Sequence, residues 1–123
     1  MTRDEFESLL DEILESIPDQ FAEKLENVEF LVEDRPDGAT RKQMKLRGDE
    51  TLLGLYQGVP FSYRSPTWYA GVLPDRIIIY QRNIETAAGK PERIKAVLRR
   101  TLLHEIAHYF GISDRRLRDI GAY

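Results

Sequence analysis

The feature that most constrains this chain is a helical segment carrying its two histidines, His104 and His108, four residues apart. Four residues is close to one turn of an α-helix, so both imidazoles project from the same face. Two imidazoles placed in this way lie within reach of a single metal ion. Glu105 projects about 100° from His104 and about 60° from His108, which places it beside such an ion rather than on it. The motif therefore predicts a metal-binding helix with this face open to a cleft.

The rest of this helix has a matching apolar pattern. It is predicted to run from Pro91, which suits a first helical turn, to about Phe110, with Gly111 ending it. Its apolar residues centre on the side roughly opposite the two histidines, so the histidines should lie outside the core-facing stripe. These residues are Leu102, Leu103, Ile106, Ala107 and Phe110. The alternative is that both histidines are surface groups near a helix C-terminus, where a positive charge is favourable.

A third candidate ligand follows the helix. Asp114 comes six residues after His108, and the whole run reads His-Glu-x-x-His-x-x-Gly-x-x-Asp. This is the metzincin spacing, with aspartate in place of the third histidine. A carboxylate oxygen is an accepted zinc ligand, and three protein ligands would leave a fourth position for water. The competing interpretation is that Asp114 or Ser113 only caps the last helix.

The remaining pattern predicts one α+β domain over residues 1–123, with a small mixed sheet packed on the active-site helix between N- and C-terminal helices. Apolar residues at three- and four-residue spacing predict the first helix, and alternation or β-branched runs predict the strands. The predicted helices are 3–16, 18–25, 91–110 and 114–120, and the predicted strands are 27–33, 51–56 and 77–81. Residues 34–38 have turn chemistry, and residues 58–71 form an irregular connection with aromatic side chains.

Composition and charge exclude several kinds of site and partner. The chain has no cysteine, which excludes disulfides, thiol catalysis and thiolate metal sites. A polar N-terminus and the lack of a long apolar run predict a cytoplasmic protein with no membrane partner. Residues 1–37 carry a net charge of −10 and residues 38–123 a net charge of +7. Because the basic residues are dispersed, we interpret this as an acidic helix lying against a basic half, and we expect no nucleic acid partner.

On these residues the chain resembles the small bacterial zincin-like proteins, a family of zinc metallopeptidases with a minimal metzincin-like fold. The resemblance rests on Leu52–Pro60, on Leu73–Ile77 and above all on Arg99–Gly121. It implies a zinc (Zn²⁺) site at His104, His108 and Asp114, with Glu105 as general base. The chain departs from full metzincins in having no methionine after Asp114, and from many members of the family in having Tyr109 directly after the motif.

Together these features predict a zinc metallopeptidase that hydrolyses peptide bonds, with Glu105 taking a proton from a zinc-bound water. The alternatives are a zincin-fold binding module without turnover, or a hydrolase of a non-peptide amide or RNA. Tyrosine could stabilise the oxyanion, but chemistry alone does not choose among Tyr63, Tyr69, Tyr109 and Tyr123. The loop around Trp68 is expected to pack on the sheet. Arg99 and Arg100 are both expected to be solvated helix charges.

Overall fold

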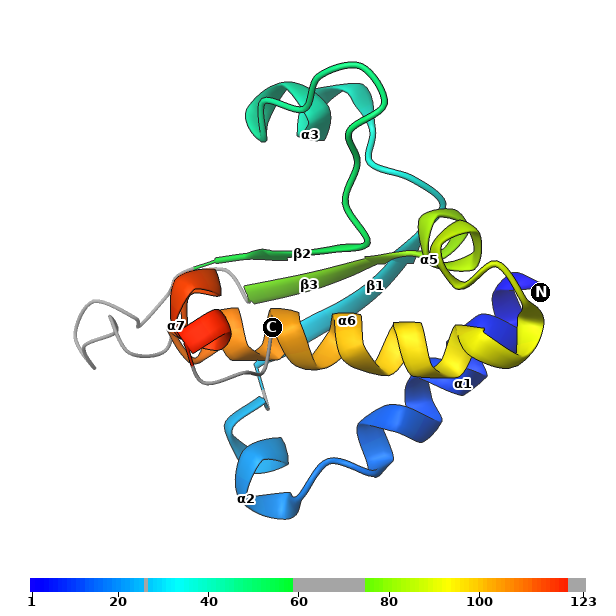
Figure 1. Ribbon diagram of the computed structural model, residues 1–123. Coiled ribbons are helices and arrows are strands. Elements are labelled where there is room, and N and C mark those ends of the chain that lie inside the picture. Colours follow the sequence, from blue (N-terminus) through cyan, green and yellow to red (C-terminus); the bar gives the residue numbers. More distant parts are fainter. Residues whose placement is uncertain (26, 59–74, 120–123) are drawn as a thin grey trace.

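A computed structural model describes residues 1–25, 27–58 and 75–119 of the chain (Figure 1). The helices, in chain order, are α1 (Arg3–Glu15), α2 (Asp19–Ala22), the 3-10 turn η1 (Glu23–Leu25), α3 (Gly38–Gln43), α5 (Gln81–Ala88), the 3-10 turn η3 (Pro91–Arg93), α6 (Ile94–Tyr109) and α7 (Asp114–Asp119). The strands are β1 (Val28–Glu33), β2 (Gly54–Gln57) and β3 (Asp75–Tyr80). The predicted α+β class is confirmed.

The three strands form a mixed sheet in the order β1-β3-β2. β1 runs parallel to β3, with Val28 opposite Asp75, and β2 runs antiparallel to β3, with Gly54 opposite Ile79. β3 is central because its apolar run Ile77–Ile79 can be buried on both faces, and all three isoleucines are buried. β2 therefore lies at an edge of the sheet in the part of the chain that the structure describes.

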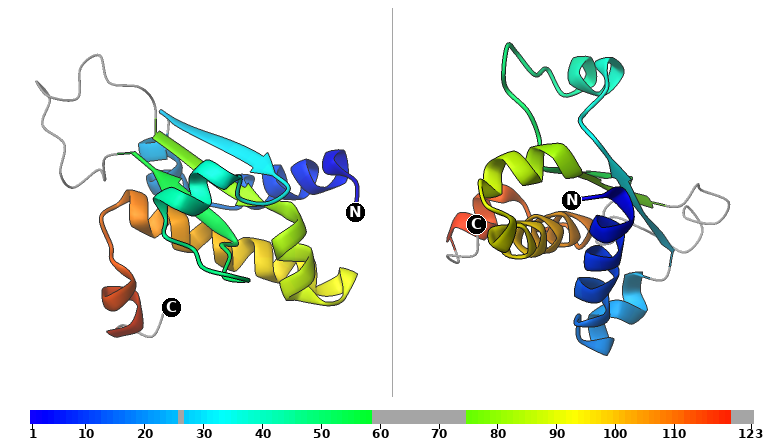
Figure 2. Two further views of the ribbon diagram at one scale, coloured as in Figure 1. Left: turned by 90° about the horizontal axis from the view of Figure 1, so that it is seen from above. Right: turned by 90° about the vertical axis from the view of Figure 1, so that its right-hand side faces the viewer.

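Helices cover one face of this sheet. α6 runs along that face and α1 packs against α6, as two further views show (Figure 2). Ile77 and Ile79 point toward these helices, whereas Ile78 points to the opposite face with Tyr80 and Leu55. The main core combines residues from α1, β3, α5 and α6: Phe6, Leu10, Ile13, Ile77, Ile79, Ile84, Leu98, Leu102, Ile106 and Tyr109, with others at the edges. The sheet and α1 thus hold α6 from two sides.

The buried face of α6 differs in one respect from the expectation. Leu102 and Ile106 are buried as predicted, but Leu103 is 42% exposed. Glu105 and Tyr109 are buried instead. The reason is the close packing of β2 on this helix, which turns the buried face toward the histidines so that they flank it rather than lie opposite it.

Two helices were not predicted from the sequence. α3 begins at Gly38, where Asp37 caps the helix by accepting a hydrogen bond from the Thr40 amide, so the expected turn at 34–38 leads into a short helix. α5 begins at Gln81 directly after β3, at a residue that was expected to belong to that strand. β2 begins at Gly54, later than the predicted start at 51. Among the described residues, no helix has the length and apolar character that crossing a membrane requires.

α1 begins with a capping box. The Thr2 hydroxyl accepts a hydrogen bond from the Glu5 amide, and the Glu5 carboxylate accepts one from the Thr2 amide. Hydrogen bonds that the Glu5 carboxylate accepts from Thr2, the one from the backbone amide first, lower the pKa of Glu5. Thr2 is therefore the N-cap of α1.

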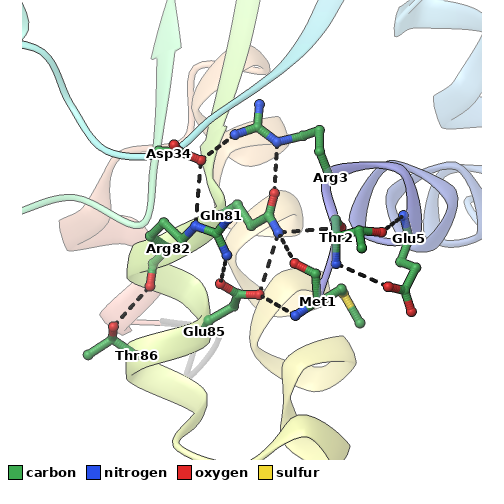
Figure 3. A network of polar contacts seen from close by, with 9 residues as sticks. All are labelled: Met1, Thr2, Arg3, Glu5, Asp34, Gln81, Arg82, Glu85 and Thr86. Carbon is green, nitrogen blue, oxygen red and sulfur yellow. Dashed lines mark hydrogen bonds and ion pairs between the residues drawn. The ribbon is translucent and has the colours of Figure 1, made fainter.

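A polar network fastens the start of α1 to α5 and to the end of β1 (Figure 3). At its centre is Gln81, which is fully buried. Its Oε1 accepts a hydrogen bond of 2.8 Å from Arg3 Nε, and its Nε2 donates one of 3.0 Å to the Met1 carbonyl. Arg3 Nη1 also donates to the Val32 carbonyl at 2.8 Å. The buried Gln81 amide therefore joins α5 to the start of α1, and Arg3 in turn joins α1 to the end of β1.

We expect Gln81→Leu to lower the free energy of unfolding by about 1–2 kcal/mol, because it leaves the Met1 carbonyl and Arg3 Nε without this partner. Urea unfolding followed by circular dichroism measures the change. Gln20→Leu is the matched control, since Gln20 is exposed on α2 and the same substitution there should alter stability by no more than about 0.5 kcal/mol. Equal effects of the two substitutions would contradict a structural role for the network.

Candidate metal centre

α6 presents the two histidines side by side. His104 and His108 lie one turn apart, and their ring centroids are 4.5 Å apart with an interplanar angle of 73°. Both side chains are only partly exposed, at 22% and 27%. Such a pair is positioned for one shared ligand rather than for two separate contacts with solvent.

The chain turns sharply after α6. Gly111 has φ of +83°, a left-handed conformation that glycine adopts without steric cost. The Gly111 amide donates to the His108 carbonyl, and the Ile112 amide donates to the Ala107 carbonyl, both at 2.9 Å. This pair of bonds is a Schellman motif, which satisfies the last helix carbonyls and reverses the chain. The turn directs the start of α7 back toward the histidines.

Ser113 and Asp114 have different roles at the start of α7. The Ser113 hydroxyl accepts a hydrogen bond from the Arg116 amide at 3.2 Å, so Ser113 caps the helix. Asp114 instead faces α6, where its Oδ1 lies 2.6 Å from His108 Nε2 and 2.9 Å from His104 Nε2. The structure thus brings together the three residues that the sequence singled out as ligands, and the cap comes from the neighbouring serine.

The charges at this centre depend on one another. The hydrogen bond to Glu105 raises the pKa of His108 to about 9, with Asp114 adding to the rise and partial burial opposing it. Partial burial also opposes ionisation of Asp114, but the hydrogen bond and charge of His108, with a contribution from His104, lower the pKa of Asp114. A positive charge between the two carboxylates therefore stabilises this arrangement.

Glu105 contacts Nδ1 of His108 and not the Nε2 atoms that face Asp114. Its side chain is almost fully buried, and its Oε1 accepts a hydrogen bond of 3.0 Å from the Tyr56 amide of β2. The same oxygen lies 3.2 Å from His108 Nδ1. Ligand atoms of His104, Glu105 and His108 all lie within 4.8 Å of one another, as in a metal-binding group. Glu105 faces Nδ1 of His108, whereas Asp114, which is not one of these three residues, faces Nε2 of both histidines.

β2 approaches α6 closely enough to require glycine. A Cβ atom on Gly54 would lie 2.9 Å from Thr101 Cγ2 and 3.2 Å from Glu105 Cγ. The absence of a side chain lets the strand lie against the helix, which places the Tyr56 amide over Glu105. No sequence motif marks this contact, because it is made by a backbone amide 49 residues away from Glu105.

A cavity of about 660 Å³ opens at this centre. One side is the face of α6 that carries His104, Glu105 and His108, and the opposite side is the segment from Thr51 through β2. Asp114 closes one end. The predicted cleft beside the histidines is therefore present, and its wall is the edge strand of the sheet.

Of the four tyrosines considered as oxyanion donors, only Tyr109 lies within the described residues. The Tyr109 hydroxyl donates to the Lys24 carbonyl at 2.7 Å, so it points into the core and not toward the histidines. Tyr63, Tyr69 and Tyr123, and the loop around Trp68, lie outside the described residues. The Tyr56 hydroxyl donates to the buried Asp75 at 2.9 Å, which helps to hold β2 in place.

The chain is similar to known proteins over most of its length. A sequence profile of the family described as "Zincin-like metallopeptidase" matches residues 25–122. No curated protein matches the chain. Among solved structures, a conserved hypothetical protein from Thermus thermophilus matches with a TM-score of 0.60 and 22% sequence identity, over 89% of this chain and 94% of that chain. At that identity the structural likeness concerns the fold alone.

Proposed function

Because the chain belongs to the Zincin-like metallopeptidase family, we propose that it is a zinc-dependent peptidase. The proposed ligands are His104, His108 and Asp114. The observation that carries the proposal is the position of Asp114 Oδ1, which lies within hydrogen-bond distance of Nε2 of both histidines. The resemblance to this family seen in the sequence is confirmed by the family match.

The donor set fits zinc. Two imidazole nitrogens and one carboxylate oxygen form a ligand set found in catalytic zinc sites, which keep a fourth position open. The raised pKa of His108 supports the fit, because the two carboxylates beside it favour a cation at this point. When bound, zinc would supply Lewis acidity, which acidifies water and polarises a carbonyl group.

Glu105 is the proposed general base. Its Oε1 accepts the Tyr56 amide bond and lies next to His108 Nδ1, so its orientation is set from two sides. Proton transfer then falls to Oε2, which would take a proton from the attacking water and pass it to the leaving amine. Its position on α6 directly after His104 places it beside the ligand set.

The proposed substrate is a peptide bound along β2. In the antiparallel ladder the Tyr80 amide donates to the Leu53 carbonyl at 3.0 Å, so by alternation the backbone groups of Gly54 and Tyr56 point away from β3. Since the Tyr56 amide already donates to Glu105, an extended peptide would add to this edge through main-chain hydrogen bonds at Gly54. Because this edge is a wall of the cavity, a bound peptide would pass directly over the candidate metal centre.

The first test is the metal content of the purified protein, measured by mass spectrometry. We expect about one zinc per chain for the proposed three-ligand site. His104→Ala should abolish zinc binding. Asp114→Ala should weaken it by more than the roughly 10–100-fold that loss of an outer-shell partner costs.

Asp19→Ala is the matched control, because Asp19 occupies the first turn of the short helix α2 as Asp114 does in α7. It should keep the zinc content of the wild type. If the wild-type protein holds no zinc after reloading and dialysis, the proposal is wrong. A similar loss in Asp19→Ala and Asp114→Ala would remove Asp114 from the ligand set.

A further inference from the structure

Tyr56 contacts two carboxyl groups, one through its backbone and one through its side chain. Its amide donates to Glu105 Oε1 at 3.0 Å, and its hydroxyl donates to Asp75 Oδ2 at 2.9 Å. Because the backbone groups of Tyr56 point away from β3, the hydrogen bonds between β2 and β3 do not hold this amide. The position of the amide over Glu105 therefore depends on what holds the rest of the residue.

The register of the sheet explains why the Tyr56 hydroxyl reaches Asp75. Tyr56 is paired with Ile77, and Asp75 lies two residues before Ile77 on β3, so all three side chains lie on the face that packs on α6. Asp75 is thus the diagonal neighbour of Tyr56, at a separation of about 7–8 Å that a long aromatic side chain can span. The bond follows from strand pairing and not from a local motif.

Asp75 holds the end of β2 at two points. Its side chain is buried, and one of its oxygens accepts the Tyr56 hydroxyl bond. The backbone directly after β2 packs on the other oxygen, so closely that a Cβ atom on Gly58 would overlap with it. Asp75 therefore fixes this end of the strand from the side of the sheet.

The ring of Tyr56 is held by α6. It packs edge-on against Tyr109, with ring centroids 5.9 Å apart and an interplanar angle of 78°. Tyr109 is itself buried, and its hydroxyl donates to the Lys24 carbonyl. The side chain of Tyr56 is thus held at its hydroxyl by β3 and at its ring by the end of α6.

We propose that Tyr56 and Asp75 are positioning residues for Glu105. Asp75 holds the Tyr56 hydroxyl, and the Tyr56 amide in turn keeps the Glu105 carboxylate in the orientation that proton transfer requires. This inference rests on the proposed peptidase function. Ligand atoms of Glu105 and the two histidines lie within 4.8 Å of one another, so a Glu105 carboxylate released from the amide can turn out of its place beside the ligands. A displacement of about 1 Å at a catalytic group can cost about 100-fold in rate.

The first test is hydrogen exchange of the residue 56 amide, measured by NMR on zinc-supplemented protein, so it does not depend on turnover. Tyr56→Phe keeps the ring and removes only the hydroxyl. We expect the residue 56 amide of this variant to exchange about 10- to 100-fold faster than that of the wild type. The Tyr80 amide, which donates to the Leu53 carbonyl at the other end of β2, should change much less. Equal acceleration of both amides would be a loss of global stability and would overturn the positioning role.

Tyr80→Phe is the matched control, because Tyr80 is also buried and its hydroxyl bonds to Thr40 on the other face of the sheet. It should leave exchange at residue 56 and peptide cleavage near their wild-type values. Asp75→Asn keeps an oxygen that can accept the Tyr56 hydroxyl bond, so it should accelerate exchange less than Tyr56→Phe. If Asp75→Asn has the same effect in the Tyr56→Phe background as in the wild type, Asp75 does not act through Tyr56 and leaves the proposal.

The second test is the hydrolysis of a peptide that the zinc-loaded wild type cleaves from a mixed library. Tyr56→Phe should keep about one zinc per chain and lower kcat by about 10- to 100-fold with little change in KM. A loss confined to KM would overturn the proposal and assign Tyr56 to peptide binding. If the wild type holds zinc but cleaves no peptide, the peptidase proposal fails and the catalytic part of this inference fails with it. The exchange measurement still decides whether Tyr56 and Asp75 fix the amide.

Discussion

Glu105→Gln is expected to keep zinc and to lose peptide hydrolysis by about 10²–10⁴-fold, the usual contribution of a general base. Glutamine has the same size as glutamate, and its carbonyl oxygen can still accept the hydrogen bond from the Tyr56 amide. The fold and the three proposed ligands should therefore be preserved, while the group that accepts the proton is removed. The measurement is cleavage of a mixed peptide library, followed by mass spectrometry, beside zinc content.

The same experiment separates the rival functions. A binding module without turnover predicts that neither the wild type nor Glu105→Gln cleaves any peptide, although both hold zinc. Glu92→Gln is the matched control, because Glu92 is exposed in η3 at the start of the same helical segment. It should cleave like the wild type. Cleavage by Glu105→Gln at the wild-type rate would remove Glu105 from the mechanism.

The local part of the candidate site could be predicted from the sequence. His104, Glu105 and His108 are neighbours on one helix, and Gly111 ends that helix in a turn that returns Asp114 to the histidines. All of these relations are set by backbone geometry over fewer than a dozen residues. The sequence does not decide between a ligand and a cap at Asp114, because Ser113 and Asp114 are both good capping residues.

The long-range part could not be predicted. Gly54 and the Tyr56 amide meet Glu105 only because β2 packs on α6, and neither residue carries a side-chain signature of that role. Such contacts depend on tertiary structure, which a motif does not encode.

The same contrast holds for the fold. The helices at 3–16 and 91–110 and the strands around 28–33 and 77–80 were predicted, since each has a sustained apolar period or a β-branched run. α5 was missed because only Ile84 and Ala88 of its apolar residues are buried, and no turn residue separates the helix from β3. α3 was missed because none of its residues is buried. The sequence signal for α3 is Asp37, which caps the helix but is equally typical of a turn.

Gly54→Ala is expected to lower the free energy of unfolding by about 1–3 kcal/mol, the usual cost of inserting a methyl group into a packed interface. The new Cβ would lie 2.9 Å from Thr101 Cγ2, and 3.2 Å from both Glu105 Cγ and Ile78 O. To relieve the two contacts with α6, β2 must move away from this helix. That movement lengthens the Tyr56–Glu105 hydrogen bond, so peptide cleavage should fall together with stability.

Urea unfolding of Gly54→Ala, Thr101→Ser and the double variant tests this explanation. Serine removes the Cγ2 methyl at 2.9 Å but can keep the hydroxyl bond to the Val97 carbonyl. Gly54→Ala should therefore cost less in the Thr101→Ser background than in the wild type, which is the coupling expected of side chains in contact. Gly38→Ala is the matched control, because a Cβ there has no atom within 4 Å. If Gly54→Ala cost no more than Gly38→Ala, the close approach of β2 to α6 would not be what holds Glu105 in place.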